Sequence, residues 1–242
     1  MQRYGLPTDQ LHGWQRSPHA NTSGPNGSKT PSCTGCHGAH ADASQQLGGV
    51  ARACGRCHTR EQDYFDKSPH SKAFTKKGLG ECAVCHDVHD VSLAAQLVGL
   101  GADSACSKCH LRDEKPRRVA KELATQVASA RGAASQARKV FDDATRYGKT
   151  LAGSAAALES LQDSEVRLNA EIHSLDPQAV GRAAARVKRA ARDLESLPKS
   201  ATATRRTEHL VAYSMVVLSG LLFLMLLGNA LWLGTRQRNG GS

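Results

Sequence analysis

The chain has 242 residues, a formal net charge of +10, a sequence pI near 9.4 and only 4% aromatic residues. Residues 1–114 are nearly neutral, with 12 Lys and Arg against 11 Asp and Glu, and they are rich in Gly, Pro, Ser and Lys. This composition excludes an ordinary polypeptide core for the first half of the chain, because too few large apolar side chains are present to hold about 110 residues together.

The first half is dominated by one motif, Cys-x-x-Cys-His, which occurs four times and uses all eight cysteines. It is the attachment signature of c-type haem, since two thiols add to the porphyrin vinyl groups and the adjacent imidazole binds the iron. The motif predicts four covalently bound haem c groups. The predicted thioether residues are Cys33, Cys36, Cys54, Cys57, Cys82, Cys85, Cys106 and Cys109, and the proximal iron ligands are His37, His58, His86 and His110.

Zinc is the main alternative ligand for these cysteines. Seventeen residues separate the first two cysteine pairs and twenty separate the last two, spacings that also suit two four-cysteine zinc ribbons. Zinc places no demand on the residue after the second cysteine, however, and a histidine follows it in every copy. The same argument disfavours a disulfide scaffold or thiol redox chemistry, so haem is the preferred interpretation.

The four motifs form two related units, at about residues 10–60 and 61–114. Ser17-Pro18-His19 precedes the first motif as Ser68-Pro69-His70 precedes the third, and the first motif of each unit is followed by a second histidine. This order indicates an internal duplication of a dihaem unit. The histidines that recur at matched positions are the predicted distal iron ligands: His19, His40, His70 and His89.

Distances along the chain predict how the distal histidines pair with the haems. His40 lies three residues after His37, so it can hardly reach the opposite face of the same haem. We therefore expect His40 to serve the second haem of its unit and His89 the haem on the fourth motif, which leaves His19 and His70 for the first haem of each unit. His12 is a reserve ligand, and His173 and His209, which have no repeat partner, are expected to be surface residues.

Residues 10–114 resemble the multihaem cytochromes c with doubled Cys-x-x-Cys-His motifs, including the Ser-x-His element ahead of the first motif. The resemblance covers less than half of the chain but rests on specific motifs. It implies a string of closely packed bis-histidine haems that passes electrons, in a head with little regular secondary structure.

From residue 115 the composition changes to Ala, Leu, Arg and Glu, and apolar residues recur at steps of three and four. Three helices are predicted, near 116–147, 151–174 and 177–197, with Asp176 as an N-cap and Pro177 in the first helical position. Their narrow, Ala-rich stripes predict that residues 115–208 form a helical stalk or docking bundle, which could also join a second copy or another subunit.

The segment Leu210–Leu233 is an almost wholly apolar run of 24 residues. Its length predicts a transmembrane helix at 209–234, followed by a short cytoplasmic tail at 235–242. Because c-type haem is attached outside the cytoplasmic membrane in bacteria, we expect a single-pass protein of that membrane with its head on the periplasmic side. The expected fold class is thus mostly α: a multihaem head, a helical bundle and one C-terminal span.

The predicted function is electron transfer and not catalysis, so no catalytic residues are assigned. The head would relay electrons from a membrane donor, such as the quinol pool or an oxidoreductase subunit, to a periplasmic or extracellular acceptor through redox partner proteins. Alternatives are a quinol dehydrogenase or small-molecule reductase subunit and, less favoured, a zinc-ribbon membrane protein or a haem-based sensor.

Residues 115–208 carry a net charge of +7, which suits lipid headgroups or an acidic partner in this compartment, and no nucleic acid is expected.

Overall fold

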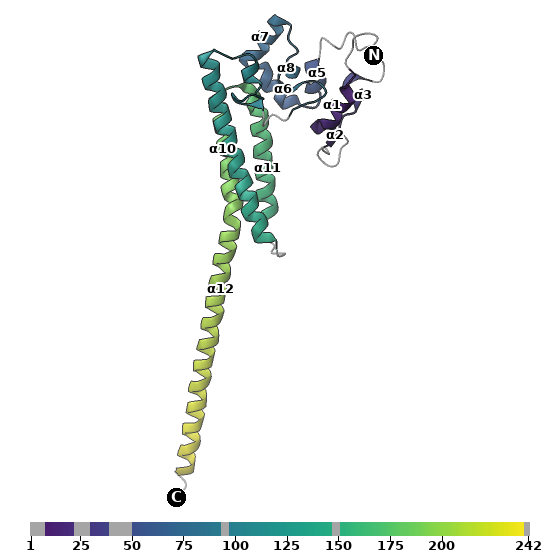
Figure 1. Cartoon of the computed structure of the whole chain (residues 1–242). Helices are drawn as coiled ribbons and strands as arrows, with labels where there is room; N and C mark the ends of the chain where they lie inside the picture. The colour runs from purple at the N-terminus through teal and green to yellow at the C-terminus, as the bar shows by residue number, and fades with distance from the viewer. Residues whose placement is uncertain (1–7, 22–29, 39–49, 93–96, 147–150, 240–242) are drawn as a thin grey trace.

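The structure is a computed structural model, and it describes residues 8–21, 30–38, 50–92, 97–146 and 151–239. A head of short helices lies at one end of a three-helix bundle, and one helix of the bundle continues far beyond the other two (Figure 1). The chain is mostly helical, as predicted, and no strand occurs within these ranges.

The head contains more helix than expected. Each Cys-x-x-Cys-His motif lies in or beside a helical turn. The short helices α6 and α7 lie between the second and third motifs. The elements are α1 (Gln10–Arg16), α2 (Pro18–Asn21), α3 (Cys33–His37), α5 (Val50–Gly55), α6 (Thr59–Asp66), α7 (Pro69–Lys77), α8 (Cys82–His86) and the 3-10 turn η4 (Cys106–Lys108). The expectation of little regular secondary structure is therefore wrong, because the motifs themselves are helical.

Local capping explains where α7 begins and ends. The Ser68 side chain accepts a hydrogen bond from the backbone N–H of His70 at 3.3 Å, and Pro69 occupies the first turn, where a missing N–H is not needed. Gly78 ends the helix with a φ of 62°, a left-handed conformation that glycine adopts at little cost. The Ser-Pro-His element is thus a helix start.

The bundle consists of α10 (Glu114–Thr145), α11 (Ser154–Glu171) with the 3-10 turn η5 (Ile172–Ser174), and α12 (Pro177–Asn239). The first two helices lie close to their predicted positions. The third begins where predicted, and the Asp176 carboxylate accepts a hydrogen bond from the backbone N–H of Gln178 at 2.9 Å. It does not stop near 197, however, but runs for 63 residues.

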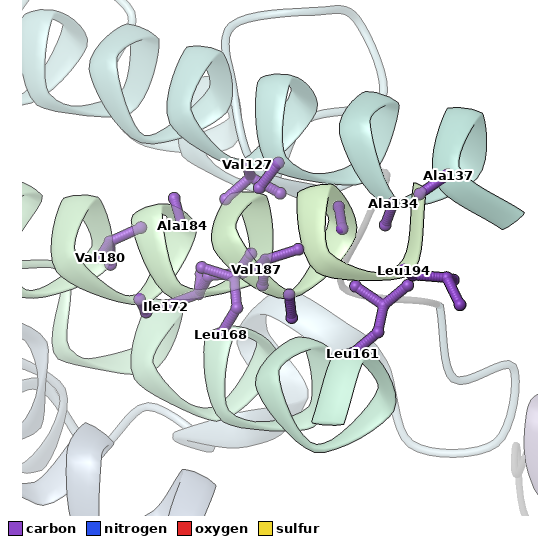
Figure 2. Close-up of a cluster of buried hydrophobic side chains, with 14 of the residues drawn as sticks. Val127, Ala134, Ala137, Leu161, Leu168, Ile172, Val180, Ala184, Val187 and Leu194 are labelled. Carbon is purple, nitrogen blue, oxygen red and sulfur yellow. The ribbon is translucent and has the colours of Figure 1, made fainter. Parts of the chain in front are cut away.

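The hydrophobic core of the protein lies in this bundle. Helix α12 lies between α10 and α11, and its apolar side chains contact both neighbours (Figure 2). Many of the buried residues are alanines, whose small side chains allow close approach of the helices. The core comprises Leu123, Val127, Ala130, Ala134, Ala137, Leu161, Leu168, Ile172, Val180, Ala183, Ala184, Val187, Ala190, Ala191 and Leu194.

Ion pairs at the edge of this core connect the helices. Glu165 occupies a position in the apolar stripe of α11 and pairs with Arg138 of α10. Glu171, at the end of α11, pairs with Arg186 of α12 at 2.8 Å. Because each pair joins two different helices, the charges favour this register over a displaced one.

The C-terminal part of the chain corrects one prediction. A membrane span needs about 20 consecutive, predominantly apolar residues. Among the residues whose placement is described, no helix is both long enough and apolar enough to cross a membrane. The predicted transmembrane helix at 209–234 is therefore wrong, and the boundaries drawn at 208/209 and 234/235 fall inside the continuous helix α12.

Leu161→Ala should destabilise the bundle by about 2–5 kcal/mol, because the side chain is fully buried between helices and its removal leaves a cavity. Far-UV circular dichroism during denaturant unfolding measures the loss. Val166→Ala on the same helix is the control, since Val166 is 46% exposed and its truncation should change stability by no more than about 0.5 kcal/mol. Equal effects for both variants would contradict the assignment of the core.

Candidate functional site

The four Cys-x-x-Cys-His motifs share one local conformation. In the second and fourth motifs the histidine N–H donates to the carbonyl of the first cysteine, at 2.9 Å in each case. The first and third motifs are the α-helical turns α3 and α8. In such a turn, residues three apart lie on the same face, so the two thiols of each motif project together with the histidine beside them.

The motifs follow one another in space in the order of the sequence. Arg56, in the second motif, donates a hydrogen bond to the Cys36 carbonyl of the first motif at 3.0 Å. A hydrogen bond from the Cys82 thiol lowers the pKa of Cys54 to about 7, which joins the second motif to the third. Burial, and then the nearby Cys106 thiol, raise the pKa of Cys85, which places the third motif beside the fourth. No two of the eight cysteines form a disulfide.

The central feature of the head is a set of four histidine ring pairs. Each pair joins the histidine of one attachment motif to a histidine from another part of the chain, and the ring planes are inclined by 10–46°. The centroid separations are 6.1 Å for His19 and His58, 6.0 Å for His37 and His89, 5.9 Å for His70 and His110, and 5.8 Å for His86 and His173.

These separations fit a metal ion held between two imidazoles. Two metal–nitrogen distances of about 2 Å, added to the distance from each nitrogen to its ring centre, place the centroids about 6 Å apart. Ordinary aromatic pairs span about 4.5–7 Å, so the distance alone does not identify such a site. The discriminating observation is recurrence, because every motif histidine has one such partner.

The histidines of the two Ser-Pro-His elements lie beside the second motif of their unit and not the first. His19 lies beside His58, and His70 lies beside His110, so the predicted pairing of these residues is reversed. Phe74, one helical turn after His70, packs its ring on that histidine at 5.1 Å.

His89 also differs from its predicted place. It lies beside His37, so it connects the second unit to the first instead of serving the fourth motif. Helix α1 supports it: Arg16 pairs with the neighbouring Asp90 at 2.7 Å, and a Cβ added to Gly13 would lie only 3.2 Å from the His89 Cβ. His40, the corresponding predicted ligand of the first unit, lies outside the described residues.

Burial keeps several of these imidazoles neutral. It lowers the pKa of His19 and of His70, and in each case the partner histidine lowers that pKa further. Burial also lowers the pKa of His86, against a hydrogen bond to the Ser92 carbonyl that raises it. The neutral ring is the form that binds a metal ion.

Sequence reasoning missed one member of the set, His173. It belongs to η5 in the bundle, and its ring lies beside His86 of the head. No repeat marks it, and nothing in its sequence surroundings distinguishes it from a surface histidine. His12, the reserve ligand, is exposed and belongs to none of the four pairs.

The described His, Cys, Asp and Glu residues nowhere gather in a group of three or more that could hold a metal ion. No known protein family, curated protein or solved structure matches the chain.

Gly13→Val should displace His89 from His37, because the added atoms meet the His89 backbone and Cβ at short range. In the haem-loaded protein, a high-spin ferric signal from up to one of the four irons is expected in paramagnetic resonance. Gly132→Val is the control, since a Cβ there meets nothing within 4 Å. A fully low-spin Gly13→Val protein would show that α1 does not position His89.

Proposed function

We propose that the chain is a tetrahaem c-type cytochrome that carries electrons. The observation that supports this most strongly is the pairing of every attachment-motif histidine with a second imidazole at about 6 Å. Each haem, when bound, supplies an iron that accepts and releases one electron. The cysteines of the four motifs hold the porphyrins, and the motif histidines are the proximal ligands.

Three of the distal ligands come from within the head: His19, His70 and His89. Each lies beside a motif histidine from a different segment, so ligation closes the head into one unit. Two imidazoles per iron leave no coordination position for a substrate. Electron transfer therefore fits the site better than reduction of a small molecule at iron, and no catalytic residue is assigned.

The order of the motifs in space supports a relay. The first motif contacts the second, the second contacts the third, and the third lies beside the fourth. An electron that enters at one end of this series has a path through neighbouring sites to the other end. Redox partner proteins at the two ends would be the donor and the acceptor.

The chemistry of haem attachment supports a periplasmic location, and the charge distribution supports an acidic partner. Because c-type haem is attached outside the bacterial cytoplasm, the head would work on the periplasmic side. Residues 115–208 carry 18 Lys and Arg against 11 Asp and Glu, so the bundle offers a basic surface to an acidic redox partner.

The haem-to-protein ratio tests the proposal directly. The intact mass of the holo-protein should contain four porphyrin adducts, and a pyridine haemochrome assay should give four haems per chain. Replacing Cys54 and Cys57 together by serine should remove one adduct, and each other motif provides a matched comparison. Bound zinc in place of porphyrin, or a mass without adducts, would overturn the proposal.

All four irons should be six-coordinate and low-spin, because each has two imidazole ligands. Paramagnetic resonance of the native oxidised protein measures this. A stoichiometric high-spin ferric signal in the native protein would show an open coordination site, and it would favour a small-molecule reductase over an electron carrier.

A further inference from the structure

We propose that His173 would be the second imidazole ligand of the iron bound by His86, in the haem attached through Cys82 and Cys85, so that the helical bundle completes one of the haem sites. This inference rests on the proposed function. It replaces the expectation that His173 is a surface residue, and it assigns a ligand outside both repeat units.

The ring geometry of this pair matches that of the other three. The centroids of His86 and His173 are 5.8 Å apart and their planes are inclined by 22°. The end of the bundle that carries His173 lies against the head, because α6 packs on both α11 and η5. The fourth pair thus forms at the contact between head and bundle.

Hydrogen bonds fix which nitrogen of each ring is free. Nδ1 of His173 lies 3.1 Å from the carbonyl of Asn169 and 3.0 Å from that of Ala170, and Nδ1 of His86 lies 3.1 Å from the Ser92 carbonyl. A carbonyl can only accept, so Nδ1 of both rings carries the proton. In the neutral ring this tautomer leaves Nε2 available to a metal, which is the arrangement found in metal-binding histidines.

The bundle holds His173 in a fixed place. Its neighbour Ile172 is 4% exposed and belongs to the hydrophobic core. The Ser174 hydroxyl donates to the Glu171 carbonyl at 2.7 Å, and the Glu171 carboxylate pairs with Arg186. Residues on both sides of His173 are therefore anchored, and the ring is presented by a rigid support and not by a flexible loop.

The internal repeat gives an independent reason for a ligand from beyond the head. The first motif of the first unit, with His37, faces His89, which belongs to the second unit. The equivalent motif of the second unit, with His86, would need a histidine from a following unit. The bundle follows instead, and its His173 occupies that role. Terminal repeats commonly depend on a dissimilar capping element of this kind.

His173→Ala in the full-length holo-protein tests the assignment. We expect four haems to remain attached, one of the four irons to become high-spin in paramagnetic resonance, and added imidazole to restore the low-spin spectrum. His12→Ala is the control, because this exposed histidine belongs to no ring pair, and its spectrum should equal that of the native protein. Circular dichroism checks that the bundle is intact.

The outcomes separate the two proposals. A native protein without haem defeats the proposed function. Four low-spin haems in His173→Ala overturn the role of His173 and leave the proposed function standing. If His173→Ala disrupts the bundle, His173→Met decides, because a thioether ligand keeps the iron low-spin but raises its reduction potential. One haem of raised potential supports the assignment, and four unchanged potentials overturn it.

Discussion

The meeting of histidine rings from distant segments is the constraint that organises the head. Among the residues of the head that the structure describes, few large apolar side chains are buried; Phe74 and Leu97 are among them, each 8% exposed. Ordinary packing is therefore weak, and the relative positions of the short helices are coupled to the ring pairs. His37 and His89 join the two units, while the Ser-Pro-His histidines connect helix starts to the second motif of each unit.

The bundle, in contrast to the head, is stabilised by packing of its own side chains. Its core is continuous and apolar, it has cross-helix ion pairs, and it needs no bound group to explain its packing. The two parts meet where α6 lies on α11 and η5. With His173 as a ligand, a well-packed element supports a site in a part of the chain that cannot build its own core.

The sequence predicted what depends on local chemistry. The start of α12 at Pro177 and the approximate positions of α10 and α11 follow from neighbouring residues. The ring pairings could not be predicted, because spacing shows which histidines are near in the chain but not where a helix directs them. His173 carried no signal at all, since its role depends on the contact between head and bundle.

The length of α12 was misjudged for a related reason. A change from charged to apolar residues predicts a boundary between a stalk and a span, but helix formation requires only that backbone hydrogen bonding continue. The helix passes through the change in composition without interruption. The change in composition is therefore a change in the side chains along α12, while the backbone of the helix continues unchanged.

The placement of His173 sets an order for assembly. His58 follows His19 by only 39 residues, so their pair can close before the bundle has folded. His173 follows His86 by 87 residues, and its position depends on a turn whose support includes α12. Closing so long a loop is slow compared with local contacts. With His173 as its ligand, the third site would then be the last to close, after the turn that carries His173 has folded.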